Sequence, residues 1–154
     1  MDHQIDEIDA RLLRIVQRDA DLSAAELAER VHLSPSACHR RLQRLRQAGV
    51  VQGHVALLDA RRVGRPTTVF VEISLSTQAD EVLDAFEAAV ARIPDVLECH
   101  LMTGAYDYLL KVVARDSEDF ATIHRRHLAR LPGVAKLQSS FALKTVFKTT
   151  ALPV

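Results

Sequence analysis

The sequence has 154 residues, 48% of them hydrophobic, and its apolar runs are all too short to cross a membrane as a helix. Lysine plus arginine and aspartate plus glutamate both number 20, so the net charge of zero neither indicates nor excludes a nucleic-acid partner. The acidic first residues exclude a secretory signal, so we expect a cytoplasmic protein in which Cys38 and Cys99 are buried free thiols.

Three helices are predicted in the first third of the chain. Apolar residues recur at helical spacing over residues 6–19. Ser23 and Glu26 have the spacing of a capping box at the start of a short second helix. The dipeptide Ser34-Pro35 favours the start of a third helix, predicted over residues 34–48. A three-residue turn joins the last two helices, so this segment is predicted to be a helix-turn-helix.

The third helix combines an apolar side with a basic side. Residues 34–49 contain four arginines and no acid. On a helical wheel, Cys38, Leu42 and Leu45 share the side that faces the other two helices, and polar residues occupy the opposite side. This pattern is typical of a helix that enters the major groove of DNA. The residues predicted to contact double-stranded DNA are Ser34, Ser36, Ala37, His39, Arg40, Arg41, Gln43 and Arg44.

Two roles are expected within this set. Residues near the start of a recognition helix usually reach the bases, which favours Ser36, Ala37, His39 and Arg40, with Gln43 as a further candidate. Arg41, Arg44 and Arg46 are expected to meet phosphates. The alternative is a solvated basic face without DNA contacts. The capped short helix, the tight turn and the absence of acids together favour DNA binding.

A change of pattern divides the chain into domains. Residues 50–58 are expected to form a wing or a connecting strand, and residues 59–66, which are charged and contain Gly and Pro, are the predicted linker. The helix-turn-helix domain is therefore predicted over residues 1–58, and a second domain over residues 67–154.

The second domain alternates strand and helix patterns in the order β-α-β-β-α-β. This order is typical of a ferredoxin-like fold, a four-stranded sheet with both helices on one face. The predicted strands are 67–75, 96–103, 108–115 and 134–148, and the predicted helices are 79–92 and 117–131.

The predicted strands carry large apolar residues on both faces. Val69 and Val71 alternate with Phe70, and Leu110 alternates with Leu109. A sheet with one solvated face would show polar residues at every second position. We therefore expect another copy of the chain to cover the second face.

The turn between the two central strands, 104–107, is open to two interpretations. Gly104 permits a positive φ and the close approach of a ligand, and Asp107 could pair with an ammonium group. An ordinary β-turn also favours Gly and Asp. The residues alone do not decide between a binding site and a turn.

The sequence contains no pattern typical of catalysis or of a metal site. His124 and His127 are three residues apart on a predicted helix, but no cysteine or carboxylate at ligand spacing completes a metal site. Cys99 and His100 point to opposite faces of a strand, so they form no catalytic pair. We therefore expect neither a metal ion nor an enzyme activity.

Long blocks of the sequence resemble a known family. Leu33–Leu45 and Gly49–Leu58 are similar to its helix-turn-helix and the segment that follows, and Glu98–Lys111 is similar to its sensor-domain signature. Ser139–Leu143 and Thr149–Val154 are similar to members of one subgroup. These blocks span essentially the whole chain in order. Together they resemble the leucine-responsive regulatory protein and asparagine-regulator (Lrp/AsnC) family of feast/famine regulators.

The resemblance implies dimers that associate further, often into octamers, and an amino-acid effector bound between dimers. It implies no other cofactor, and the subgroup points to an apolar or sulfur-containing amino acid. The residues that would bind the effector are Thr103, Gly104, Ala105, Tyr106, Asp107 and Ser139. The pair His39-Arg40 departs from the best-known relative, which has an apolar residue and an acid there, so operator preference is not carried over.

We therefore expect an α+β protein in which a winged helix-turn-helix domain joins a ferredoxin-like sensor and oligomerisation domain. It would bind pseudo-palindromic DNA as a dimer and change its assembly when an amino acid binds. Two alternatives remain open: an architectural protein that compacts DNA without an effector, and a small ferredoxin-like enzyme with a helical appendage. Discrete rather than uniform protection of DNA would exclude the first, and the lack of a catalytic set disfavours the second.

Overall fold

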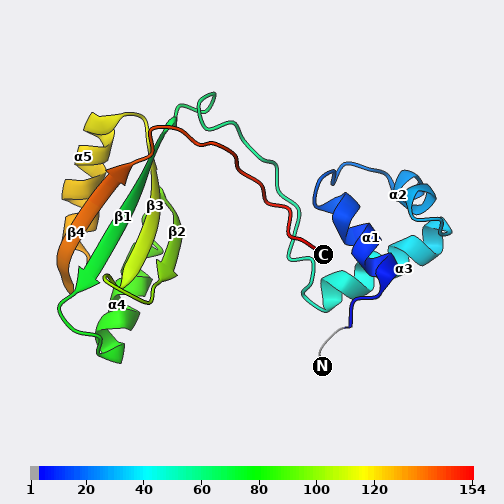
Figure 1. The fold of residues 1–154 in the computed structure, drawn as a ribbon, viewed down its shortest axis with the longest axis horizontal. Helices are drawn as coiled ribbons and strands as arrows, with labels where there is room; N and C mark the ends of the chain where they lie inside the picture. The colour runs from blue at the N-terminus through cyan, green and yellow to red at the C-terminus, as the bar shows by residue number, and fades with distance from the viewer. Residues whose placement is uncertain (1–3) are drawn as a thin grey trace. The chain divides into compact units, whose positions relative to one another are not determined.

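The computed structural model describes residues 4–154. The chain forms two compact units (Figure 1). The helical unit contains the residues up to Leu57 together with Phe147–Val154, and the sheet unit contains Leu58–Val146. The last segment of the sequence thus folds with the helical unit, whereas the sequence pattern grouped it with residues 67–154.

The helical unit contains α1 (Glu7–Val16), α2 (Ala24–Arg30) and α3 (Pro35–Gln47). The capping box predicted at Ser23 and Glu26 is present, because each side chain accepts a hydrogen bond from the backbone N–H of the other residue. The Ser34 side chain accepts from the backbone N–H of Ala37 at the start of α3. The predicted helix-turn-helix is therefore confirmed in its elements and in its capping residues.

Helix α1 ends at Val16, earlier than the predicted end at Asp19. The Asp19 side chain accepts a hydrogen bond from the backbone N–H of Asp21, 3.2 Å away. A short acid that bonds the following backbone competes with helix continuation. Local side-chain chemistry therefore ends the helix before its apolar pattern runs out.

A small apolar core joins the three helices. Leu12 of α1, Leu27 of α2 and Cys38 of α3 are buried together. Because α3 is amphipathic, burial of its apolar side leaves the polar side in solvent. The backbone of His32, in the turn between α2 and α3, has a φ of 57° and so reverses the chain within a few residues.

The segment 50–58 forms no strand, although all of its residues are described by the structure. Val55 and Leu57 are 82% and 72% exposed. A strand needs a neighbour that takes up its backbone hydrogen bonds, and this segment pairs with none within the described chain. The strand expected at this position is therefore wrong, and the segment is an extended connection.

The sheet unit contains the predicted β-α-β-β-α-β order. Its sheet is antiparallel with strand order β2-β3-β1-β4, and α4 and α5 cover one face (Figure 1). The ferredoxin-like architecture is thus confirmed. The elements are β1 (Thr67–Leu75), α4 (Asp80–Val90), β2 (Val96–Leu101), β3 (Tyr108–Ala114), α5 (Ser117–Arg126), a 3₁₀ turn (Leu128–Arg130) and β4 (Val134–Phe141).

The core of this unit lies between the sheet and its two helices. Val69, Val71 and Ile73 of β1 are completely buried there, as is Phe86 of α4. Burial of a side chain of this size is worth roughly 1.5–3 kcal/mol, so this face of the sheet supplies much of the driving force for folding.

The opposite face of the sheet is mixed rather than apolar. It carries Phe70, Leu109 and Val113 as predicted, but also Lys111, which lies directly opposite Phe70. Leu101 lies on the helix side of the edge strand β2 and is 62% exposed. The open face thus offers a smaller apolar area than the sequence suggested.

The two cysteines differ in their accessibility. Cys38 and Cys99 are both free, but only Cys38 is buried, so the expectation of a buried Cys99 is wrong. Cys99 is exposed because it lies on the edge strand β2.

The helices of residues 4–154 are all too short or too polar to cross a membrane.

Candidate DNA-binding and effector-binding sites

Helix α3 presents a polar face that is set by burial of the opposite side. Cys38 and Leu45 are completely buried, which fixes the rotation of the helix. The residues on the other side are therefore directed to solvent. Exposed residues of this face are Ser34, Ser36, His39, Arg40, Gln43 and Arg44, with Ala37 half-buried beside them.

Arg41 does not belong to the solvent-facing set. Its Nη1 atom lies 2.6 Å from a carboxylate oxygen of Asp6 and 2.8 Å from one of Asp9, both contributed by the start of α1. The Arg41 side chain is only 24% exposed. The structure therefore places Arg41 at the junction of α1 and α3, where it holds the helices together, and its expected phosphate contact stays a prediction.

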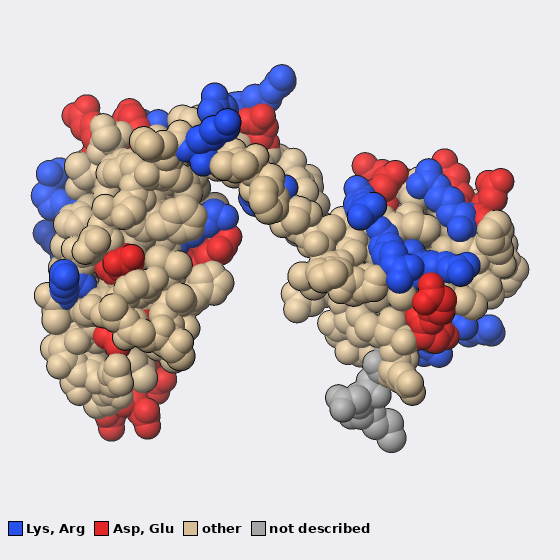
Figure 2. Space-filling model, in the orientation of Figure 1, with Lys and Arg blue, Asp and Glu red and all other residues tan. Residues whose placement is uncertain are grey.

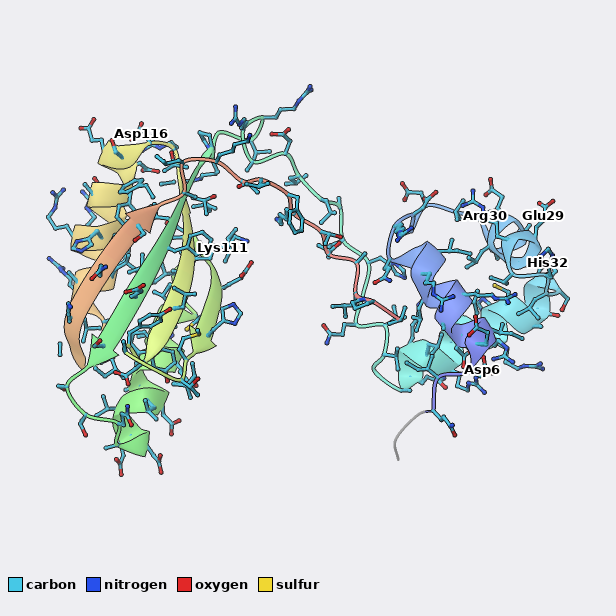
Figure 3. All side chains as sticks on the ribbon, viewed as in Figure 1. Asp6, Glu29, Arg30, His32, Lys111 and Asp116 are labelled. Carbon is cyan, nitrogen blue, oxygen red and sulfur yellow. The ribbon has the colours of Figure 1, made fainter. Side chains whose placement is uncertain are left out.

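Asp9 is the centre of this junction. Its carboxylate is completely buried and also accepts a hydrogen bond from Arg44 Nη2 at 2.8 Å. Figure 3 shows Asp6 at the start of α1, where its carboxylate accepts from the backbone N–H of Asp9 at 2.8 Å. That bond and the Arg41 guanidinium lower the pKa of Asp6, and the bonds to Asp6 and Asp9 raise the pKa of Arg41.

The arginines of α3 therefore differ in how far they are available. Arg44 is 51% exposed although one nitrogen is bonded to Asp9, and Arg46 Nη2 lies 3.0 Å from His54 Nε2. Among the residues that the structure describes, no carboxylate is paired with Arg40. Figure 2 shows basic side chains gathered on one side of the helical unit with acids beside them. Arg40 thus lies outside the junction that holds Arg41 and Arg44.

The candidate effector turn is anchored to strand β1. The backbone N–H of Asp107 donates to the carbonyl of Ile73 at 2.9 Å. The Asp107 carboxylate accepts from the backbone N–H of Leu75 and from the amide of Gln78, each at 2.7 Å. Asp107 therefore has a structural role that sequence reasoning missed, because its partners are about thirty residues away along the chain.

The tip of the turn is open to solvent. Thr103, Gly104 and Ala105 are exposed, and Tyr106 is half-buried. Gly104 has a φ of 131°, a conformation that residues with a side chain rarely adopt. The glycine thus lets the chain pass over the end of the sheet with its backbone uncovered.

Ser139 lies apart from this turn within one chain. It pairs with Val71 in the β4–β1 register, whereas the turn is bonded to Ile73 and Leu75 of β1. At about 3.3 Å per strand residue, the separation along β1 is roughly 7–13 Å. The structure brings together five of the six predicted effector residues and leaves Ser139 one strand away.

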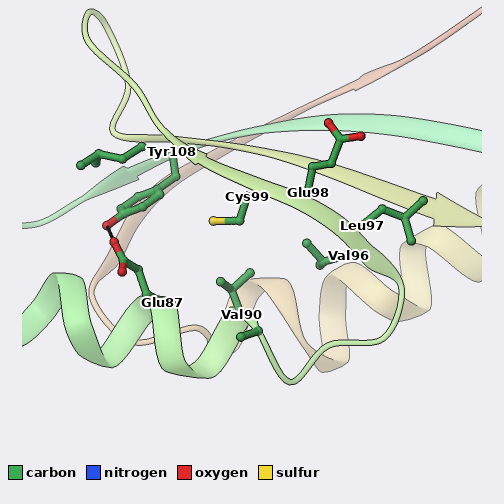
Figure 4. A pocket seen from close by; sticks show the side chains of 9 residues that line it. Glu87, Val90, Val96, Leu97, Glu98, Cys99 and Tyr108 are labelled. Atoms are coloured by element: carbon green, nitrogen blue, oxygen red, sulfur yellow. Dashed lines mark hydrogen bonds between the residues drawn. The ribbon is translucent and has the colours of Figure 1, made fainter. Parts of the chain in front are cut away.

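A cavity lies between α4 and β2 (Figure 4). Its volume is about 370 Å³, and Tyr108 donates a hydrogen bond to Glu87 at 2.6 Å on its wall. Burial and this bond raise the pKa of Tyr108, and partial desolvation of the sulfur at the cavity wall, together with the Glu87 charge, raises the pKa of Cys99 although the residue is exposed. The thiol is therefore neutral near pH 7 and is not an activated nucleophile.

The two histidine candidates, His124 and His127, lie in α5 and directly after it. His124 packs edge-on against Phe120 with ring centroids 6.2 Å apart. Within the described part of the chain, no three His, Cys, Asp or Glu residues are placed to hold a metal ion. Several titratable groups of the sheet unit form ion pairs, such as Lys111 with Glu98 at 2.6 Å (Lys111 is labelled in Figure 3).

Comparison with known proteins matches both units. Residues 5–52 match a family model described as winged helix-turn-helix DNA-binding, and residues 68–152 match the model of the Lrp/AsnC ligand binding domain. The chain is 37% identical to the DNA-binding transcriptional activator DecR of Escherichia coli K12, with 97% of this chain and 99% of DecR covered. It is 36% identical to the leucine-responsive regulatory protein of the same organism, over 96% of this chain and 90% of that protein.

Solved structures agree over the same length. The transcriptional regulator NMB0573 of Neisseria meningitidis, crystallised as a complex with L-Met, is 38% identical with a TM-score of 0.92, and 97% of each chain is covered. An AsnC family regulator of Agrobacterium tumefaciens has the same identity and TM-score, with 96% of each chain covered. These relatives are regulators that bind DNA and not enzymes, which confirms the family expected from the sequence. The chain belongs to the Lrp/AsnC family of transcriptional regulators.

Proposed function

We propose that this chain is an amino-acid-responsive regulator in which effector binding changes self-assembly and, through it, operator binding. One observation carries the proposal. A relative crystallised with L-Met is similar over 97% of this chain at a TM-score of 0.92, and the tip of the turn 103–107, residues 103–105, is exposed in this chain. Bacterial DNA lies in the cytoplasm, which is therefore the proposed location.

For DNA, we assign base reading to the start of α3. Ser36, His39 and Arg40 are exposed there, and Ser34 caps the helix beside Ala37. Gln43 lies one turn further along the same face. Arg guanidinium groups match the acceptors of guanine in the major groove, so Arg40 is the main candidate for base recognition. Arg44, half-exposed, reaches a phosphate, whereas Arg41 contributes by fixing the helix.

For the effector, we assign the turn 103–107. An uncovered backbone at Gly104 offers N–H groups to an α-carboxylate, with Thr103, Ala105 and Tyr106 beside it. Asp107 offers the lone pairs that Leu75 and Gln78 leave unused to an α-ammonium group. Because Ser139 is one strand away in the same chain, it would contact an effector from a second copy.

Self-association of the chain is the third part of the proposal. The open sheet face carries Phe70, Leu109 and Val113, which a second copy would bury. Dimers would then associate into larger assemblies, up to octamers, with the effector between dimers. An effector that prefers one assembly shifts the population toward it and changes which operator spacings are occupied.

A thermal-shift screen over the twenty L-amino acids tests the effector, because a ligand that binds only the folded state raises the melting temperature with its concentration. We expect at least one apolar or sulfur-containing L-amino acid to raise it and its D-enantiomer not to. Equal shifts for both enantiomers, or none for any amino acid, would contradict the proposal. Footprinting with DNase tests the DNA role, since discrete protected sites indicate a regulator and uniform protection a compacting protein.

A further inference from the structure

The segment Phe147–Val154, here called the docking segment, folds with the helical unit although it follows the last strand of the sheet unit. It lies against a groove of about 450 Å³ between α1 and the residues that follow α3. Leu152 and Val154 contribute to the lining together with Leu13, Val16 and Val50. Neither the proposed DNA contacts nor the proposed effector turn uses this contact.

Side chains at the end of α1 hold the docking segment through hydrogen bonds to its backbone. The Gln17 side chain donates to the carbonyl of Leu152 and accepts from its backbone N–H, both at 2.8 Å. Arg14 Nε donates to the main-chain oxygen of Val154 at 2.7 Å. One amide side chain thus satisfies both backbone groups of Leu152, as a neighbouring strand would.

The contact is built for reversible binding. The Leu152 side chain is 71% exposed, so the segment is held mainly by three solvent-exposed hydrogen bonds and buries little apolar surface. Exposed hydrogen bonds contribute little net stability each, because water replaces them when the segment leaves. The docking segment can therefore detach without unfolding the helical unit.

Helix α1 connects this contact to the recognition helix. Its last residues bind the docking segment through Arg14, and its first turn binds α3 through the pairs of Asp9 with Arg41 and Arg44. The path from the docking segment to α3 is thus a rigid helix with specific polar contacts at both ends.

We propose that the docking segment is a second attachment between the two units, besides the connection before β1, and that it restrains α1 and, through Asp9, the orientation of α3. The docking segment forms one wall of the groove, through Leu152 and Val154. The inference rests on the DNA-binding role of the family and not on the amino-acid effector, so its test is carried out without any amino acid.

The test uses the full chain with Gln17→Ala, a deletion of residues 151–154, and Arg18→Ala as the matched surface control. Hydrogen exchange followed by mass spectrometry reports on the Leu152 amide and on residues 7–16. Gln17→Ala should exchange faster than wild type in both places, the deletion should exchange faster in residues 7–16, and Arg18→Ala should change neither. Gln17→Ala and the deletion variant should each bind operator DNA about fivefold more weakly than wild type. A fivefold change is the lower end of the coupling typically found between two sites.

Two results would overturn the proposal. Unchanged exchange of residues 7–16 in both variants would mean that the segment does not restrain α1. Faster exchange with unchanged operator affinity would mean that the restraint does not reach α3. Gln17→Glu separates a hydrogen-bonding role from general destabilisation, because Glu still accepts from the Leu152 N–H but no longer donates to its carbonyl. It should give an intermediate effect.

Discussion

Asp9 of α1 and Arg41 of α3 are joined by a hydrogen-bonded ion pair of 2.8 Å, and the Asp9 side chain is completely buried. Arg44 binds the second oxygen of the same carboxylate at 2.8 Å. A buried carboxylate held by two guanidinium groups fixes the position of both arginines. The relationship gives Arg41 and Arg44 a role in the support of the recognition helix, and Arg40, which lies outside it, is the leading candidate for DNA reading.

Asp9→Ala is expected to destabilise the helical unit by about 1–3 kcal/mol, because two guanidinium groups lose a buried partner. Chemical denaturation measures the free energy of unfolding. Asp21→Ala, an exposed acid between α1 and α2, is the matched control and should change it little. If the two variants were equally stable, the junction would have no structural role.

Arg40→Ala is expected to weaken operator binding by about 1–3 kcal/mol if Arg40 reads a base. Fluorescence anisotropy with operator DNA and with a scrambled duplex measures both affinities. Specific binding should fall much more than non-specific binding, because a base contact distinguishes sequences and a phosphate contact does not. An equal loss on both duplexes would make Arg40 a phosphate contact.

Two variants of Asp107 separate its two roles. Asp107→Asn keeps an oxygen that can accept from the Leu75 N–H but removes the negative charge, so the turn should remain folded while effector affinity falls by about tenfold or more. Asp107→Ala removes both the accepting oxygen and the negative charge, so it should also lower the melting temperature. Operator binding without effector should be retained in both variants, and a normal effector response in Asp107→Asn would refute the ammonium contact.

Asp119 should make the stability of the sheet unit depend on pH. Hydrogen bonds from the side chain and backbone of Arg115, at 2.8 and 2.9 Å, lower the pKa of Asp119 from 3.8 to about 2. Because the folded-state pKa is the lower one, this stabilisation is fully present above about pH 4 and is lost as the pH falls toward 2.

Urea denaturation of wild type and Asp119→Asn at pH 7 and pH 2.5 measures this effect. The variant should be less stable than wild type at pH 7, and the difference should shrink at pH 2.5. Glu118→Gln, an exposed neighbour, serves as the control. A difference that is the same at both pH values would show that the Asp119 charge is not responsible.

Local sequence patterns predicted the helices and strands of the fold, but not the residue at which the pairing between two strands ends. Residues 134–148 keep a strand-like composition, yet β4 ends at Phe141. Phe141 pairs with Val69, and the last bond of this edge runs from the Ala142 N–H to the carbonyl of Thr68, near the start of β1. The strand ends because its partner does, and a single strand's sequence does not contain that information.

The candidate sites, like the fold, could be predicted as far as local sequence patterns determine them. The helical wheel identified the exposed face of α3 because burial of Cys38 and Leu45 follows helical periodicity. It did not separate Arg41 from Arg40, since the partners of Arg41 lie 32 and 35 residues away in the sequence. The role of Asp107 at the end of β1 was missed for the same reason: it depends on which strands become neighbours.

The most direct test of the central claim is the affinity for operator DNA with and without the amino acid that shifts the melting temperature. We expect the dissociation constant to change at least about fivefold with the L-enantiomer and not with the D-enantiomer, together with a change in sedimentation. An operator affinity that is identical with and without every L-amino acid would contradict an amino-acid-responsive regulator.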